Sequence, residues 1–206
     1  AYASSGSGWG ASYNFTVEAT DFDNNNVTVY LWKKVGAGGS YVLEGTQSCE
    51  PCSSTTLTFP VTMDCTDIGT NYYFFNASDS NNYTINTSEN SLTVAKDPLT
   101  MEVHAGIDSA STREGAGTTQ LLLRAYDTLK AEYVSTGVNG TFYVTEDYSV
   151  FGPIYNVTTN STGHLELNFD SNCTYSAGNQ KWKGGVEGDA CYTDTQTINY
   201  TVTVTG

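Results

Sequence analysis

Residues 13–32 read YNFTVEATDFDNNNVTVYLW and hold two strand patterns separated by a polar turn. In the first run Tyr13, Phe15 and Val17 alternate with polar residues. The same period of two resumes at Val27. Such alternation places one face of a strand in a core and the other in water. The stretch therefore predicts two half-buried β-strands joined by the turn DFDNNN.

The same pattern recurs along the rest of the chain, without helical periodicity. Further strands are expected at residues 40–45, 55–63, 71–78, 90–96, 99–105, 118–127, 139–147, 163–170, 179–185 and 198–204. Clusters of Gly, Asn, Asp and Ser separate them, and residues 106–117 are predicted to be a loop. Short strands at this spacing are typical of β-sandwiches, so the predicted fold class is all-β.

The 206 residues divide into two domains of ordinary sandwich size, about 100 residues each. Lys96-Asp97-Pro98 is the expected boundary, because a proline after a charged pair tends to end a strand. The prediction is a flexible arm or linker at residues 1–12, a first domain at 13–96 and a second at 97–206. Trp9 has no predicted core within reach of that Gly/Ser-rich arm, so it is expected to contact a neighbouring domain or molecule.

The charge balance excludes several classes of partner. The chain has 22 acidic and 8 basic residues and a formal net charge of -14. A surface so poor in base repels nucleic acid and anionic membranes. No apolar run approaches the roughly 18 to 20 residues of a membrane span, so direct membrane insertion is not expected. A signal peptide would already have been removed, and the final TVTVTG indicates an excerpt of a longer protein.

Ten Asn-x-Ser/Thr sequons suggest a glycosylated exterior. They lie at Asn14, Asn26, Asn76, Asn82, Asn86, Asn139, Asn156, Asn160, Asn172 and Asn199. Chance alone would give about four in a chain so rich in Ser and Thr. The excess predicts covalent N-glycans and a secreted, extracellular or cell-surface location.

The five cysteines also indicate an oxidising compartment. Cys173 and Cys191 are expected to form one disulfide across a glycine-permitted hairpin. A strand between Cys52 and Cys65 would span on the order of 30 Å, against about 4.4 to 6.8 Å between the Cα atoms of a disulfide. A Cys49–Cys52 bond is therefore favoured, with Cys65 unpaired or intermolecular, although Pro60 could bend the strand and permit a bond to Cys65.

Two short motifs have spacings that suggest metal binding. The motif C-x-x-C of residues 49–52 lacks the βαβ pattern of redox enzymes and a second ligand pair for zinc. Asp21, Asp23 and Asn25 have the D-x-D-x-N spacing of calcium ligands, but the Gly and Glu of an EF-hand are missing. A turn held by side-chain hydrogen bonds is favoured there, with an inter-strand calcium site as the alternative. No cofactor is predicted.

Candidates for catalysis and sugar binding are sparse. His104 and His164 are the only histidines and are predicted to be surface residues. Paired carboxylates for glycoside hydrolysis are more simply solvated turn residues. Trp32 and Trp182 suit a core better than a sugar-stacking platform. An autocatalytic isopeptide bond would need a lysine facing an asparagine, and the nearest candidates are Lys33, Lys34 and Asn90, or Lys130 and Asn199.

The second half carries a family resemblance in LLLRAYD, TFYV, TNSTGHLELNF, CTYSAGNQKWKGGV and INYTVTV. This order resembles the invasin/intimin type of bacterial immunoglobulin-like domain. Tyr175, Gly178, Gln180 and Trp182, near a cysteine, resemble more closely the tandem repeats of large archaeal surface proteins. Residues 13–32 resemble the Asp-rich opening of PKD-like and cadherin-like domains.

The resemblance implies two immunoglobulin-like β-sandwich domains in tandem with a structural or adhesive role. The expected protein is a non-enzymatic surface glycoprotein module, the repeating unit of a surface layer, stalk or extracellular filament. Its partners would be copies of itself or neighbouring domains of the same long chain. The alternative is an adhesin or carbohydrate-binding accessory module of an extracellular protein.

Overall fold

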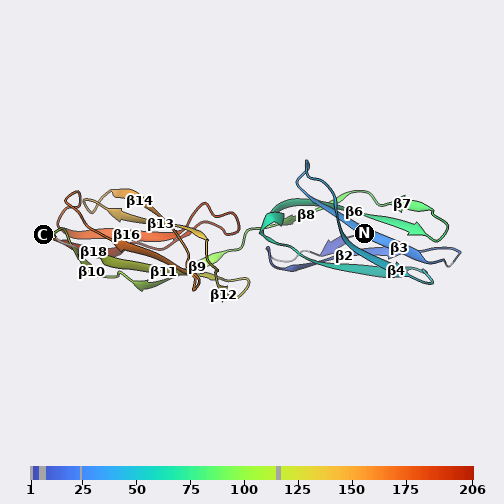
Figure 1. Ribbon diagram of the computed structural model, residues 1–206, viewed down its shortest axis with the longest axis horizontal. Helices are drawn as coiled ribbons and strands as arrows, with labels where there is room; N and C mark the ends of the chain where they lie inside the picture. Colours follow the sequence, from blue (N-terminus) through green and yellow to red (C-terminus); the bar gives the residue numbers. More distant parts are fainter. Residues whose placement is uncertain (1, 5–7, 24, 115–116) are drawn as a thin grey trace. The chain divides into compact units, whose positions relative to one another are not determined.

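The computed structural model describes residues 2–4, 8–23, 25–114 and 117–206, and the chain divides into two compact units (Figure 1). Unit 1 is Ala1–Lys96 and unit 2 is Asp97–Gly206. Each unit is built from two β-sheets with a core between them. No helix in the described part of the chain is long and apolar enough to cross a membrane.

Unit 1 contains a three-stranded and a five-stranded sheet. The smaller sheet has the order β1-β2-β5, from Tyr2–Ser4, Ser12–Ala19 and Thr55–Thr62. The larger has the order β4-β3-β6-β7, with β8 also paired to β6, from Val42–Cys49, Val27–Val35, Gly69–Asp79, Thr84–Asn86 and Asn90–Val94. A single 3-10 turn, η1 (Cys65–Asp67), connects β5 to β6.

The core of unit 1 follows from the alternation in β2. Tyr13 and Phe15 are fully buried, while Asn14 and Glu18 on the other face are exposed. The Phe15 ring meets the Tyr73 ring edge-on, with centroids 4.8 Å apart. Aromatic pairs of this geometry stabilise a core beyond their buried area, so the two sheets are joined through them.

Unit 2 contains a four-stranded and a six-stranded sheet. The smaller has the order β12-β11-β15, with β9 also paired to β11, from Glu132–Tyr133, Thr119–Asp127, His164–Phe169 and Leu99–Ala105. The larger has the order β10-β18-β16-β13-β14, with β17 also paired to β16, from Ser109–Thr112, Tyr200–Thr205, Gly178–Val186, Asn139–Thr145, Phe151–Thr158 and Thr195–Gln196.

The first strand of unit 2 changes sheets at Gly106. The segment before it, β9, pairs antiparallel with β11, and the segment after it, β10, pairs parallel with β18. Gly106 has a φ of +103°, and a Cβ there would lie 2.7 Å from Leu121 Cδ2. Only glycine accepts both that backbone conformation and that close approach, so the crossover depends on it.

Both units therefore have the immunoglobulin-like arrangement, with two sheets drawing on strands from along the whole unit. This confirms the predicted all-β fold class. The predicted strands are present with shifted ends. Six short or irregular strands were not predicted: β1, β7, β10, β12, β14 and β17.

The prediction of a flexible arm at residues 1–12 is wrong for the described part of that segment. Strand β1 pairs antiparallel with β2, so it extends the sheet of its own unit. The backbone N–H of Gly10 donates to the Met63 carbonyl at 2.6 Å. Trp9 is half-buried and packs against the core of unit 1, which corrects the expected contact with a neighbour. Residues 1 and 5–7 lie outside the described residues.

Candidate functional site

The sequon asparagines lie on the surfaces of both units. Nine have exposed side chains and only Asn76 is half-buried; the exposed ones are Asn14, Asn26, Asn82, Asn86, Asn139, Asn156, Asn160, Asn172 and Asn199. Strand positions such as Asn14 are on the solvent face, because their neighbours in sequence fill the core. An attached glycan would therefore extend into solvent without unfolding either sandwich.

Two of the sequons in unit 2 share a local geometry that presents the amide nitrogen. Asn172 Oδ1 accepts hydrogen bonds from the backbone N–H of Thr174 at 2.9 Å and from its hydroxyl at 2.6 Å. Asn160 Oδ1 accepts from Thr162 in the same way, at 2.9 and 2.8 Å. These turns occupy the oxygen of each amide and leave Nδ2, the atom that carries an N-glycan, facing solvent.

Three sequons gather at the β6–β7 hairpin of unit 1. Asn76 Nδ2 donates to Asn86 Oδ1 at 2.8 Å, and Asn82 lies in the turn between the strands. The same hairpin exposes Tyr83 at 77% and Ile85 at 72%. Large apolar side chains this exposed are a solubility liability unless something covers them, and sugars on the neighbouring asparagines would do so.

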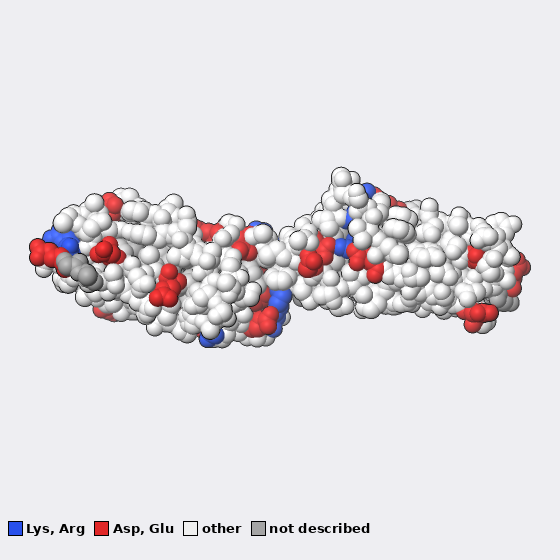
Figure 2. Space-filling view, in the orientation of Figure 1, with Lys and Arg blue, Asp and Glu red and all other residues white. Residues whose placement is uncertain are grey.

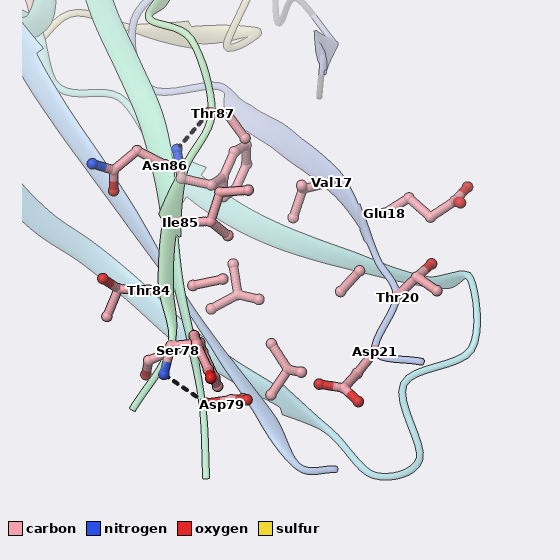
Figure 3. A pocket seen from close by; sticks show the side chains of 16 residues that line it. Val17, Glu18, Thr20, Asp21, Ser78, Asp79, Thr84, Ile85, Asn86 and Thr87 are labelled. Carbon is pink, nitrogen blue, oxygen red and sulfur yellow. Dashed lines mark hydrogen bonds between the residues drawn. The ribbon is translucent and has the colours of Figure 1, made fainter. Parts of the chain in front are cut away.

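A pocket of about 360 Å³ opens beside this hairpin (Figure 3). Val17, Glu18, Thr20 and Asp21 line it from the β2 side, and the hairpin lines it from the other. Apolar residues also line it: Ala19, Val27, Val29, Phe75 and Ala77. Asn86 is among the lining residues, but its side-chain amide points away from the pocket, toward Asn76 (Figure 3).

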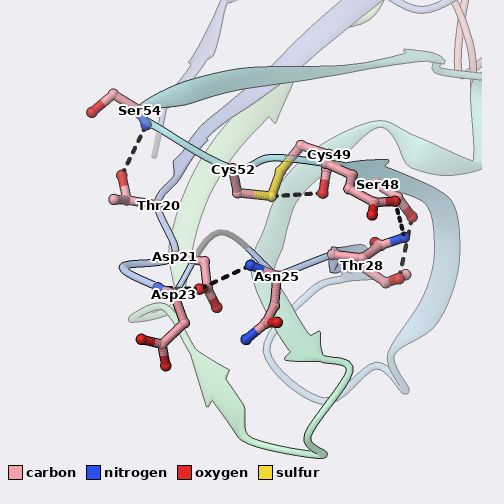
Figure 4. The surroundings of a disulfide bond; sticks show 11 residues. Thr20, Asp21, Asp23, Asn25, Thr28, Ser48, Cys49, Cys52 and Ser54 are labelled. Atoms are coloured by element: carbon pink, nitrogen blue, oxygen red, sulfur yellow. Dashed lines mark hydrogen bonds between the residues drawn. A yellow bond between two sulfur atoms is a disulfide. The ribbon is translucent and has the colours of Figure 1, made fainter.

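Next to this pocket, the disulfide Cys49–Cys52 holds the loop after β4, as predicted, with Cα atoms 5.2 Å apart (Figure 4). Cys49 is buried at 7% exposure and Cys52 is fully buried. The Cys52 carbonyl accepts from the backbone N–H of Asp21 at 2.8 Å. The disulfide loop thus supports the β2–β3 turn, a structural role.

The other cysteine predictions are wrong. Cys173 is exposed and free, whereas Cys191 is disulfide-bonded, so these two do not pair. The expected hairpin glycines, Gly184 and Gly185, belong to strand β16, which runs extended for 9 residues between the two cysteines. Cys65 is also disulfide-bonded and is not an unpaired thiol. The strand-length argument excluded only a bond between Cys52 and Cys65, so it did not show that Cys65 is unpaired.

The residues proposed for calcium form a side-chain-stabilised turn. Asp21 Oδ1 accepts from the backbone N–H of Asp23 at 2.8 Å and from that of Asn25 at 3.2 Å (Figure 4). These bonds occupy the carboxylate with its own backbone, as an Asx turn does. Among the described residues, no group of three or more His, Cys, Asp or Glu side chains could hold a metal ion.

The two histidines are surface residues, but the fold brings them together. His164 Nε2 lies 3.4 Å from His104 Nδ1, and Glu102 Oε2 lies 3.5 Å from His104 Nε2. His104 and His164 come from β9 and β15, on opposite sides of β11. This contact could not be predicted from the sequence, because the two histidines are far apart in the chain. It depends on the strand order, in which β9 and β15 flank β11.

Of the two tryptophans predicted to lie in a core, only Trp182 does. Trp182 is fully buried, and its Nε1 donates to the Gly106 carbonyl at 2.9 Å. The core prediction is wrong for Trp32, which is half-buried on the outer face of β3, opposite Phe74 on β6, because Leu31 and Lys33 take the inward positions.

These features define a two-domain all-β protein of immunoglobulin-like sandwiches. No protein-family model and no curated protein matches the sequence. Among solved structures, the chain is similar to a tetra-tandem repeat in the extending region of a large adhesion protein, with a TM-score of 0.48 and 14% identity over 94% of this chain and 46% of that chain. It is also similar to red sea bream transglutaminase, with a TM-score of 0.41 and 12% identity over 100% of this chain and 31% of that chain. The chain spans less than half the length of either structure. At these TM-scores neither similarity adds to what the strand topology shows.

Proposed function

We propose that this chain is a structural module of a cell-surface glycoprotein, a repeating unit of a surface layer, stalk or extracellular filament. Its two sandwiches act as spacers, and its partners are neighbouring domains of the same long chain or copies of itself. The observation that carries the proposal is the exposure of nine of the ten sequon asparagines, spread over both units.

The distribution of charge supports the same role. Figure 2 shows scattered acidic side chains and few Lys or Arg on the face displayed, with most of the surface uncharged. Exposed apolar residues lie next to sequons in unit 2 as well: Ile154 at 60% is two residues before Asn156, and Ile198 at 74% directly precedes Asn199. Glycans at these positions would provide the solubility that charge provides in other proteins.

The test is to secrete the chain from a glycosylating eukaryotic host and remove N-glycans enzymatically in heavy-oxygen water, which labels each occupied asparagine. Peptide mass spectrometry is expected to find several labelled sites in both units, including Asn160 and Asn172. Asn168 is exposed but lies outside any sequon, so it serves as the unlabelled control. A chain without glycan at any site would overturn the proposal.

A carbohydrate-binding or adhesive module is the second candidate, and the pocket beside β7 favours it. Its apolar lining, together with the exposed lining residue Tyr83, could receive a sugar ring, since rings stack on aromatic faces. The two functions are separable by experiment.

A glycan array probed with the unglycosylated chain and with Tyr83→Ala distinguishes them. A binding module gives concentration-dependent signals that Tyr83→Ala abolishes. Substitution of another exposed tyrosine in unit 2, Tyr148→Ala, leaves these signals unchanged. A structural module gives no signal with any of the three chains.

A further inference from the structure

A half-buried lysine and two buried aspartates meet at the start of unit 2. Asp97 lies two residues before β9, and Asp127 is the last residue of the adjacent β11. Lys130 lies in the turn after β11, and its Nζ donates to Asp97 Oδ2 and, at 2.9 Å, to Asp127 Oδ2. The pairing of β9 with β11 therefore places one amine between two carboxyl groups.

The two aspartates of this cluster are shielded from solvent. The side chains of Asp97 and Asp127 are 0% and 1% exposed, and that of Lys130 is 20% exposed. Tyr192 covers the site, with the Lys130 Nζ 5.7 Å from its ring centroid. Keeping all three of these groups charged is costly, because attraction seldom repays the full loss of hydration. Condensation of the lysine with one carboxyl group would leave at most one of them charged.

The two carboxyl groups differ in their hydrogen bonds. Asp127 Oδ1 accepts from the backbone N–H groups of Leu129 and Lys130, at 2.9 and 3.0 Å. Asp97 Oδ1 is buried without a hydrogen-bond partner. Burial raises the pKa of Asp97. Burial also acts to raise the pKa of Asp127, but its hydrogen bonds outweigh this and lower it. Asp97 is therefore suited to be the neutral acid and Asp127 the carboxylate.

We propose that Lys130 Nζ condenses with the Asp97 side chain to form an intramolecular isopeptide bond, with Asp127 as the catalytic residue. Asp127 takes a proton from Nζ, and the freed amine attacks Cγ of the protonated Asp97 carboxyl group. Asp127 then passes this proton to the departing hydroxyl and accepts the second proton that the nitrogen loses, so one water molecule leaves, the C–N bond forms and Asp127 ends protonated. No electrons are transferred and no co-reactant is needed. Direct contact between the amine and the acid provides the proximity that such a reaction requires.

The proposed partner of the lysine, Asp97, differs from the two asparagines that the sequence offered as the nearest candidates. Asn199 is exposed, and Asn90 is exposed with its Nδ2 donating to the Ser88 carbonyl at 3.1 Å. The reacting acid is instead Asp97, which the sequence pattern had marked only as part of the domain boundary. The proposal does not depend on the surface role proposed above, since it rests on geometry within unit 2.

Unit 1 provides an internal comparison. Lys33 Nζ contacts Asp67 Oδ1 and lies 3.4 Å from Glu44 Oε1. The other oxygen of that carboxylate, Asp67 Oδ2, accepts from the backbone N–H of Asp64 at 2.9 Å. Both oxygens of Asp67 are thus hydrogen-bonded, and Glu44 is 24% exposed. This arrangement stabilises an ion pair, so only one condensation is expected in the chain.

The test is the intact mass of the unglycosylated full-length chain after reduction of its disulfides. The expected mass is lower than that of the sequence by one water molecule. Proteolytic mapping is expected to give a branched peptide that joins Asp97 to Lys130. Cyclisation of Asp97 to a succinimide cannot explain such a loss, because Pro98 has no N–H to attack the side chain.

Three variants locate the reaction. Lys130→Arg and Asp127→Asn are expected to have the full sequence mass, the second while retaining both reacting side chains. Lys33→Arg is expected to keep the loss of one water. A wild-type chain at full mass after prolonged incubation would overturn the proposal, and so would a loss of water that persists in Lys130→Arg. Because the wild-type mass is itself decisive, the test does not depend on the folding of any variant.

Discussion

The indole Nε1 of Trp182 donates a hydrogen bond to the backbone carbonyl of Gly106, at 2.9 Å. Trp182 lies in the middle of β16, and Gly106 is where the first strand of unit 2 leaves one sheet for the other. The bond thus joins the largest core side chain to the crossover between the sheets. The stability of unit 2 should depend on this pair.

Trp182→Phe is expected to lower the free energy of unfolding of unit 2 by about 2 to 4 kcal/mol, because a buried carbonyl loses its donor and a cavity opens. Urea unfolding combined with hydrogen exchange in peptides of unit 2 measures the loss. Tyr200→Phe is the control, since it keeps the ring that packs against Trp182 at 5.2 Å and removes only a hydroxyl. Equal effects of the two substitutions would contradict the assigned role of the indole N–H.

Gly106→Ala tests crowding at the crossover. Gly178 has a similar positive φ, +113° against +103°, but a Cβ there would have nothing within 4 Å. Gly178→Ala should cost only the backbone strain, about 1 to 3 kcal/mol. Gly106→Ala should cost more, because its Cβ would also collide with Leu121 and the Trp182 ring. Thermal unfolding of both variants gives the difference, and a smaller loss for Gly106→Ala would refute the steric argument.

Thiol chemistry should show a single reactive cysteine. Cys173 is exposed and free, and the other four cysteines are disulfide-bonded. Titration of the unreduced native chain with a thiol reagent is expected to give one thiol per molecule, and none in Cys173→Ser. Replacing Cys49 and Cys52 together by Ala should lower stability by about 2 kcal/mol, the loop-closure contribution of so short a loop. Three titratable thiols in the wild-type chain would contradict this pattern.

Trp9→Ala should destabilise unit 1 by about 2 kcal/mol, since the ring packs against its core. Phe22→Ala is the control, because that side chain is 96% exposed and its removal should change stability by less than about 0.5 kcal/mol. Chemical unfolding measures both variants. If Trp9→Ala left stability unchanged and instead altered the molar mass measured by light scattering, the ring would belong to an intermolecular contact.

The stability of unit 2 should depend on the protonation of His164. Burial, the Arg124 guanidinium and His104 lower the pKa of His164 below its ordinary value of 6.5. The unfolded chain then binds this proton more readily, so the free energy of unfolding falls as the pH drops through about 6.5. NMR titration should place the His164 midpoint below that value. His164→Gln should remove this part of the pH dependence, and an unchanged slope would show that other groups cause it.

Period-two alternation predicted the long strands correctly because their cores depend on local sequence. Tyr13 and Phe15 are buried for the reason that the pattern gives. Strand β1 has no such pattern and could not be predicted in this way, because it is held by backbone pairing with β2. Trp9 was misassigned for the same reason, because the core that it covers is built from strands distant in sequence.

The two side-chain contacts with the most chemical interest also could not be predicted from the sequence pattern. Lys130 meets Asp97 across 33 positions, and His104 meets His164 across 60. Both contacts follow from the order of β9, β11 and β15 in one sheet. Strand order is set by the packing of whole sheets rather than by any short motif. The local turn at Asp21 was predictable, because its carboxylate bonds only to its own backbone.

The parallel pairing of β10 with β18 determines how unit 2 responds to tension. Ser109 to Thr112 of β10 align with Val202 to Thr205 of β18. Because the strands run the same way, a pull on the two ends of the unit slides them past each other and loads all the hydrogen bonds between them at once. An antiparallel hairpin pulled from its open end would instead lose its bonds one after another. Unit 2 is thus arranged to resist stretching along the chain.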